Sequence, residues 1–339
     1  MKKIIYIIAI VCLSSSLATA QADKHSTLFY GNAAMFNPAA AGMTNGDLQL
    51  FSSYRNQWGS VSAAPFKTMN FSVDGKTFNQ SIKDGFVGMG LSYSNESAGD
   101  GKLVRSNINY SLNYAIEVER NLYVSFGVSA GLGQYKLGYD NFNWSTQWTG
   151  VDYDQSLYNF EPFYESSTTV FDLGTGVFVY GSVSPDVDLY GGISINNILR
   201  PDVSFINADD RLYRSISLTF HPEIRIPNTV IAINPKFFTF IQGPNREINA
   251  GAEFKYFLKE SSHFTGYFDE MSLSLGTFYR MGDALLITTG FNMAGISFGA
   301  AYDLNTSALK AASNGMGGFE FYLRYNLGFS FRYGSRGSF

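Results

Sequence analysis

Hydrophobic and polar residues alternate with a period of two along most of the chain after residue 47. The clearest case is 107–116, where Ile, Tyr and Leu alternate with Asn, Ser and Ala. Such alternation is typical of β-strands that have one apolar and one polar face. Strong segments also cover 87–93, 122–132, 187–195, 248–258, 271–279, 285–293, 296–302 and 319–327, and weaker ones cover 48–54, 66–74, 170–180, 212–220 and 229–240. The pattern predicts an all-β protein of roughly 14 antiparallel strands, an even number as in single-chain bacterial barrels.

Each strand has two sets of alternating positions, called the apolar phase and the polar phase here. Their residue types distinguish a membrane barrel from a soluble one. In strand after strand the apolar phase carries almost no charge, and the polar phase is rich in Gly, Ser and Asn. Soluble surfaces carry many more Lys and Glu, whereas a membrane barrel has an apolar outside and a polar lumen. Only 15% of the residues are charged and 16% are aromatic. The sequence therefore predicts a transmembrane antiparallel β-barrel of the outer-membrane type.

The N-terminus has the layout of a secretory signal peptide at 1–20. Two lysines precede an apolar run from Ile4 to Leu13, and an Ala-Thr-Ala triplet precedes Gln21. The single cysteine, Cys12, lies within this run, so the mature chain is expected to contain no thiol and no disulfide. After residue 20 no apolar stretch approaches the roughly 20 residues that a transmembrane helix needs.

The remaining chain divides into an N-terminal periplasmic lead-in segment at 21–46 and one barrel at 47–339. Outer-membrane barrels alternate short periplasmic turns with longer surface loops. Short connections are expected in the periplasm at 117–121, 181–186 and 293–294, and long ones at the cell surface at 133–169, 196–211 and 303–317. Two connections break this rule, 259–270 and 280–283, so a shift of one hairpin in the second half stays open.

Composition and motif spacing argue against catalysis and against a cofactor. The net charge is −4 and no basic cluster is present, so nucleic-acid binding has no electrostatic basis. The three histidines lack carboxylate or serine companions at motif spacing, and Asp152 and Asp154 lack the ligand series of a strong calcium site. The glycine-rich stretches lie inside alternating segments and do not link a strand to a helix, as a phosphate-binding loop would.

Three sequence blocks resemble the PorP/SprF family, over the whole mature chain. The first contains Asn37, Pro38 and Gly42 in Phe-Asn-Pro-Ala-Ala-Ala-Gly. The second is Tyr54-Arg55-Asn56-Gln57-Trp58, and the third joins Tyr302-Asp303 to a closing Gly-Phe-Glu strand that ends at Glu320. The chain departs from the family pattern at Ala301, where a serine is expected, and in its long aromatic stretch at 139–167.

The resemblance implies a non-catalytic outer-membrane component of type IX protein secretion and gliding motility in Gram-negative bacteria. The partners it implies are an exported surface protein or adhesin and periplasmic lipoproteins of the secretion machinery, in a setting of outer-membrane lipid. Core-machinery and adhesin-paired subgroups both remain open. A small-solute or hydrophobic-substrate channel is the alternative function.

Several charged or strongly polar side chains fall on the predicted lumen phase: Arg55, Gln57, Asp74, Arg105, Lys255, Arg280, Asp303, Glu320 and Arg324. Because closure makes the first and last strands neighbours, Arg55, Asp74, Asp303, Glu320 and Arg324 are expected to meet inside. A low-dielectric lumen penalises unpaired charge. A network that fixes closure or seats a plug or partner is one interpretation, and ordinary lumen packing is the other.

Two further segments have open interpretations. Asn37-Pro38 with Gly42 predicts a rigid turn that caps the periplasmic mouth, or else a periplasmic docking element. The long surface loop is a candidate contact for an exported protein, since exposed aromatics beside charges are typical of interfaces; a loop packed into the barrel mouth is the alternative. Its aromatic residues are Trp144, Trp148, Tyr153, Tyr158, Phe160 and Phe163.

Overall fold

The computed structural model describes residues 26–44, 46–77, 84–99, 102–138, 142–158, 160, 167–206, 209–259, 270–308 and 310–328. The predicted signal peptide at 1–20 and the loop residue Phe163 lie outside the described residues.

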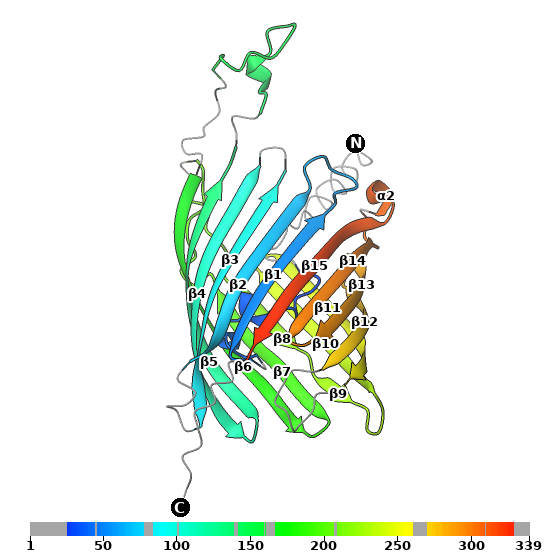
Figure 1. The fold of residues 1–339 in the computed structure, drawn as a ribbon. Coiled ribbons are helices and arrows are strands. Elements are labelled where there is room, and N and C mark those ends of the chain that lie inside the picture. Colours follow the sequence, from blue (N-terminus) through cyan, green and yellow to red (C-terminus); the bar gives the residue numbers. More distant parts are fainter. Residues whose placement is uncertain are drawn as a thin grey trace, which may run out of the picture.

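One antiparallel sheet forms the described structure and closes on itself (Figure 1). Its strands are β1 (Leu48–Gln57), β2 (Phe66–Thr77), β3 (Gly85–Ala98), β4 (Leu103–Glu119), β5 (Leu122–Lys136), β6 (Ser167–Ser184), β7 (Val187–Asn196), β8 (Ser215–Phe220), β9 (Glu223–Arg225), β10 (Ile231–Gln242), β11 (Asn245–Lys259), β12 (Met271–Arg280), β13 (Ala284–Met293), β14 (Ile296–Asn305) and β15 (Met316–Leu327). Strand β1 pairs with β15, and β10 pairs with β11. Since β8 and β9 both pair with β7 and β10, they share one strand position. The predicted 14-strand barrel is confirmed.

The apolar phase was predicted to face outward and the polar phase to face the lumen, and strand β4 shows this arrangement. Ile108, Tyr110 and Leu112 are exposed on the outside of the barrel, whereas Ser111 and Asn113 are buried in the lumen. The same alternation recurs around the wall and gives it an apolar exterior, which is what a lipid-facing barrel requires. Among the described residues, no helix is long and apolar enough to cross a membrane.

The two ends of the barrel differ in the length of their connections. The connections at 137–166, 197–214 and 306–315 all lie at one end, called here the long-loop end, at the top of Figure 1. The connections at 120–121, 185–186 and 294–295 lie at the opposite, turn end. Strands β11 to β15 follow the predicted segments in order, so the second half contains no shifted hairpin. The short strand β9 was missed, because the two residues before it, His221 and Pro222, interrupt the alternation.

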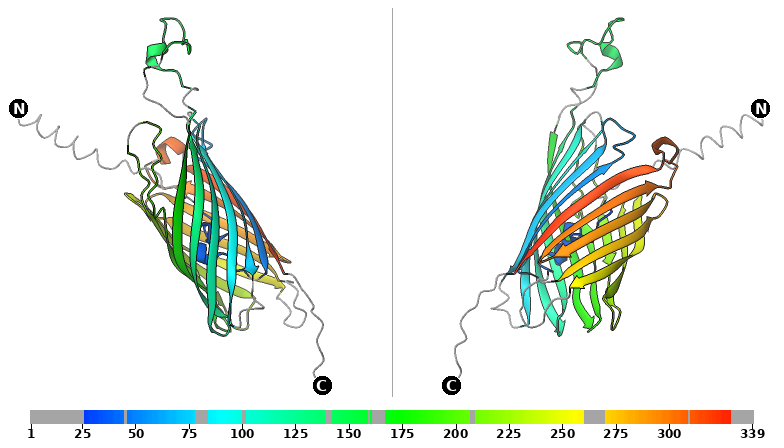
Figure 2. Two further views of the ribbon diagram at one scale, coloured as in Figure 1. Left: turned by 90° about the vertical axis from the view of Figure 1, so that its left-hand side faces the viewer. Right: turned by 45° about the vertical axis from the view of Figure 1, so that its right-hand side comes forward.

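A segment of the chain fills part of the lumen. Residues Ser26–Thr44, called the plug here, run inside the ring of strands from the long-loop half toward the turn end (Figure 2). The plug contains two single-turn 3-10 helices, η1 (Ala33–Met35) and η2 (Pro38–Ala40), and η2 packs against β3, β4, β5 and β6. The lead-in segment was expected at the periplasmic mouth; its described part lies within the barrel.

Candidate functional site: a plug held by a buried polar network

The Asn-Pro-Ala motif forms the centre of the plug. The Asn37 side-chain oxygen accepts the N–H of Ala39 at 3.0 Å and caps helix η2, with Pro38 at the first helical position. Its amide nitrogen donates to the carbonyls of Val177 and Ile193 on β6 and β7, at 2.9 and 3.2 Å. One side chain thus caps the plug helix and ties it to the barrel wall.

Small residues in the wall make room for this motif. A Cβ atom at Gly127 would come within 2.5 Å of the Ala39 backbone, and one at Gly176 would collide with the Asn37 side chain. The Asn113 amide donates to the Ala41 carbonyl at 2.6 Å. The glycines of the lumen phase therefore allow the plug backbone to approach the wall closely.

The last residue of the motif needs glycine for its own conformation. Gly42 has φ +74°, and a Cβ there would come within 2.7 Å of the Gly75 carbonyl oxygen. Its N–H donates to Asp74 at 2.9 Å, and Gln49 donates to the other oxygen of that carboxylate. Asp74 thus holds the turn-end part of the plug.

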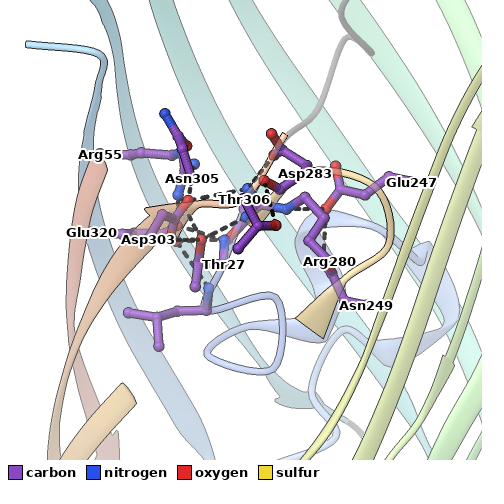
Figure 3. Close-up of polar contacts among 12 residues, drawn as sticks. Thr27, Arg55, Glu247, Asn249, Arg280, Asp283, Asp303, Asn305, Thr306 and Glu320 are labelled. Atoms are coloured by element: carbon purple, nitrogen blue, oxygen red, sulfur yellow. Dashed lines mark hydrogen bonds and ion pairs between the residues drawn. The ribbon is translucent and has the colours of Figure 1, made fainter. Parts of the chain in front are cut away.

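The N-terminal part of the plug is held by ionised side chains at the long-loop half of the lumen (Figure 3). Thr27 is completely buried. Its hydroxyl donates to Asp303 at 2.8 Å and accepts from Arg55 at 2.7 Å and from Arg280 at 2.8 Å. Its N–H donates to Glu320 at 2.7 Å. A single threonine is therefore bound by side chains from β1, β12, β14 and β15.

These charged side chains also pair with one another. Arg55 lies 2.7 Å from Asp303 and 3.0 Å from Glu320, and Arg280 lies 3.1 Å from Asp303. Arg280 also reaches Asp283 and Glu247, at 3.0 and 3.6 Å. Arg55, Arg280, Asp303 and Glu320 are at most 4% exposed. Because buried charges are costly without partners, the removal of either arginine should be strongly destabilising.

Two of the residues expected to join this cluster lie elsewhere. Asp74 binds Gly42, as described above, and Arg324 donates to the Gly31 carbonyl and to Ser297, each at 3.2 Å. Both lie nearer the turn end, because Asp74 pairs with Gln49 and Arg324 pairs with Phe51, several residues along β1 from Arg55. Arg55, Asp303 and Glu320 do come together. Gln57 is buried close to the end of β1.

Three aromatic residues of the family blocks lie away from the plug. Tyr54 packs on the rings of Phe319 and Phe321, and Tyr302 is exposed on the outer wall. Trp58 follows β1 with φ +62°, and its backbone N–H donates to the Gly317 carbonyl. The roles of these residues in family function stay predictions.

The middle of the plug is held by aromatic and cationic contacts that sequence reasoning missed. Phe29 stacks on Phe238 of β10, with ring centroids 4.9 Å apart. The ammonium of Lys236 lies 3.2 Å from the centroid of the Tyr30 ring and 3.0 Å from Glu253. The sequence places Lys236 in the lumen phase of β10. Strand alternation alone could not show that it packs against Tyr30 of the plug.

The plug divides the lumen into two cavities. A cavity of about 260 Å³ at the turn end is lined by plug residues such as Tyr30 and Met43 and by the charged ends of β7, β9 and β10. A second, of about 120 Å³ on the long-loop side, lies between plug residues such as Phe29 and Phe36 and the Asn- and Ser-rich walls of β1 to β7. Among the described residues, no group of three or more His, Cys, Asp or Glu side chains is arranged to hold a metal ion.

The described part of the long loop projects beyond the barrel rim as a small knob, residues 142–158 (Figure 1). Trp148 forms a β-bridge with Tyr153, and their ring centroids are 5.0 Å apart. The side chain of Gln147 is buried and donates to the Leu157 carbonyl at 2.9 Å. Trp148, Tyr153 and Tyr158 are exposed, as is Phe160 beyond the knob, while Trp144 packs on Phe142.

The knob also carries two carboxylates, those of Asp152 and Asp154. The Ser156 hydroxyl and N–H both donate to the Asp154 carboxylate, which lowers the pKa of that carboxyl. The knob thus presents an ionised carboxylate beside exposed aromatic rings.

A closed barrel with an apolar exterior, a polar lumen and an internal plug belongs to the class of outer-membrane β-barrels. The family model described as type IX secretion system membrane protein PorP/SprF matches residues 18–325, and the chain belongs to this family. The protein is therefore an outer-membrane component of type IX secretion. In such barrels the short turns face the periplasm and the long loops face the cell exterior.

Comparison with other proteins adds only distant matches. No curated protein matches the sequence. Among solved structures, the toluene transporter TbuX of Ralstonia pickettii is 11% identical, with 87% of this chain and 93% of that chain covered and a TM-score of 0.47. The toluene transporter TodX of Pseudomonas putida is 10% identical, with 88% and 94% covered and a TM-score of 0.47. A FadL homologue of Pseudomonas aeruginosa is also 10% identical, with 87% and 94% covered and a TM-score of 0.47.

Proposed function

We propose that this chain is a plugged, non-catalytic anchor that supports the export or cell-surface attachment of a partner protein in type IX secretion and gliding motility. The observation that carries the proposal is the plug, which is fastened at the long-loop half by Thr27 and at the turn end by Gly42. A barrel whose lumen holds a segment fixed at both ends is suited to serve as a rigid platform. Membership in the secretion family supplies the biological setting.

The knob supplies the proposed contact with the exported partner. Exposed aromatic rings surrounded by polar residues are typical binding hot spots. Trp148 and Tyr158 are 48% and 71% exposed, and each packs beside a second exposed ring, Tyr153 and Phe160 respectively. Grouped exposed rings of this kind are typical of interaction sites. We assign the turn end to periplasmic lipoproteins of the secretion machinery, because that end faces the periplasm.

A co-purification experiment tests the knob. The double variant Trp148→Ala/Tyr158→Ala should lose the co-purifying surface protein, by about thirtyfold or more if each ring contributes about 1 kcal/mol or more. Tyr213→Ala is the matched control, because Tyr213 is an exposed aromatic in another long loop. Equal loss from both variants, or from neither, contradicts the assignment of the knob.

Conductance separates the anchor from the alternative, a small-solute or hydrophobic-substrate channel. Purified protein in planar bilayers, with no partner present, is expected to conduct little because the plug is in place. Steady ion conductance or solute uptake by the unmodified protein would favour the channel and refute the anchor.

A further inference from the structure

Two prolines face each other across one strand pair of the barrel wall. Phe220 of β8 pairs with Phe237 of β10, and Ile224 of β9 pairs with Ile233 of β10. Counting along both strands from these pairs places Pro222 opposite Pro235. Pro235 is the only proline within a strand of the described structure.

The alternation of hydrogen-bonded and non-bonded pairs shows which hydrogen bonds the two prolines remove. The Ile226 N–H donates to the Ile231 carbonyl at 3.0 Å, so this facing pair is a hydrogen-bonded one. In an antiparallel ladder the bonded pairs recur every two residues, which makes the 222–235 pair a bonded position as well. Neither proline has an N–H. Both hydrogen bonds of that pair are therefore missing, and the strands are unpaired between Phe220 and Ile224.

This gap lies within the apolar exterior of the barrel. Phe220, Ile224 and Ile231 surround it and are 49%, 39% and 37% exposed. In a bilayer each backbone polar group needs a partner within the protein, since lipid offers none. At this gap the carbonyls of Pro222 and Pro235 therefore lack the ladder donors that a facing N–H would supply.

The turn-end cavity of about 260 Å³ lies directly behind the gap. Its lining includes His221, Pro222 and Glu223 on one side of the gap and Asn234 and Lys236 on the other. Two buried polar atoms of this lining, His221 Nε2 and Asn234 Oδ1, have no hydrogen-bond partner within the described structure. Buried polar atoms are seldom left unpaired, so these two indicate a polar ligand.

The charges of the cavity indicate what kind of ligand fits. Cationic and anionic side chains are equal in number among its described lining, and several pair with one another: Lys236 with Glu253, and Lys255 with Glu223 and Glu270. A lining with balanced charge suits a zwitterion better than a simple anion. The cations are Arg225, Lys236, Lys255 and Arg324, and the anions are Asp188, Glu223, Glu253 and Glu270. Arg324 also lines this cavity, and its Nε is buried without a hydrogen-bond partner among the described residues.

We propose that the gap between β9 and β10 is a lateral opening through which a phospholipid of the periplasmic leaflet places its zwitterionic head group in this cavity. The acyl chains remain outside, against the apolar wall around Phe220 and Ile224. The ammonium group meets the carboxylates, and the phosphate meets Arg324.

The test closes the opening by restoring the two missing donors. The variant Pro222→Ala/Pro235→Ala regains both ladder hydrogen bonds, which should slow hydrogen exchange at the amides of Ile224 and Phe237 by about tenfold or more. Pro227→Ala is the control, because Pro227 lies in the adjoining turn outside the ladder. It should leave this exchange unchanged.

Lipid binding is measured on the same proteins. Native mass spectrometry after reconstitution with phosphatidylethanolamine should find one retained lipid in the parent and in Pro227→Ala, and at least several-fold less in the double variant. Equal retention in all three overturns the proposal. If the double variant does not fold, Pro222→Ala alone restores one of the two bonds and should give an intermediate loss.

Soluble glycerophosphoethanolamine distinguishes the route. It should compete weakly in every variant, because it lacks the acyl chains that reach the wall. Strong binding of this soluble head group that the double variant retains would show a cavity filled from the periplasm, and would refute the lateral opening.

Discussion

The charges around Thr27 predict an unequal response to the loss of a cation and the loss of an anion. In the described network two guanidinium groups, those of Arg55 and Arg280, face four carboxylates. Arg55→Met leaves Glu320 buried with no cation in the network. Breaking a buried pair in this way costs about 3–5 kcal/mol.

The opposite change should be milder. Asp303→Asn removes one carboxylate, but Arg55 keeps Glu320 and Arg280 keeps Asp283. The loss then reduces to weakened hydrogen bonds, which amounts to about 1–2 kcal/mol. The expected order is therefore that Arg55→Met is the more destabilising change by about 2 kcal/mol.

Equilibrium unfolding by guanidinium chloride in lipid vesicles measures this difference. Arg55→Met/Glu320→Gln is the control, because it removes the stranded charge along with its partner and should recover about 2 kcal/mol through coupling of the two sites. Equal destabilisation by the two single changes, or no recovery in the double variant, would refute the assignment of these pairs.

Three further predictions concern the plug. Thr27→Val keeps the shape of the side chain and loses its hydroxyl contacts. Hydrogen exchange at the amides of positions 27 and 28 should therefore speed up about tenfold, while the unfolding midpoint of the barrel moves little. Gly127→Ala places a methyl against the Ala39 backbone and should displace the plug at a cost of about 1–3 kcal/mol; bilayer conductance should rise, whereas Gly191→Ala, whose closest contact is 3.0 Å, should leave it low. Removal of residues 26–44 should give a folded barrel with high conductance, and a barrel that fails to assemble in vesicles would show that the plug is needed for folding.

The wall of the barrel could be predicted from the sequence because lipid acts on each strand separately. Every strand needs an apolar outer phase, so the period of two appears locally, as in β4 and β5. The prediction failed where a local rule was broken. His221-Pro222 interrupts the pattern between β8 and β9, and the register that places Pro222 opposite Pro235 depends on pairing between strands.

The contents of the lumen could be predicted only in part. Arg55, Asp303 and Glu320 were identified as inward-facing, because their phase follows from their apolar neighbours. Which of them meet depends on the register between strands, which places Asp74 opposite Gln49 and Arg324 opposite Phe51, away from Arg55. The plug has no regular period, and its contacts join residues up to 294 positions apart, as in the bond from Ser26 to Glu320.

The charged network around Thr27 and the contacts of the Asn-Pro-Ala motif hold the plug in different ways. At the long-loop half, the ion pairs join one barrel strand to another, and the plug adds only the hydrogen bonds of Thr27 and its neighbours. These charges therefore remain paired whether the plug is present or absent. At the motif, Gly127 and Gly176 leave space in the wall that only the plug fills. Because that space is lined by Asn and Ser, water can occupy it at a small cost when the plug leaves. The barrel therefore keeps its ion pairs without the plug, whereas the apolar contacts of Phe29 and Phe36 with Phe238 would be lost. The plug thus depends on this packing more than on the charged network.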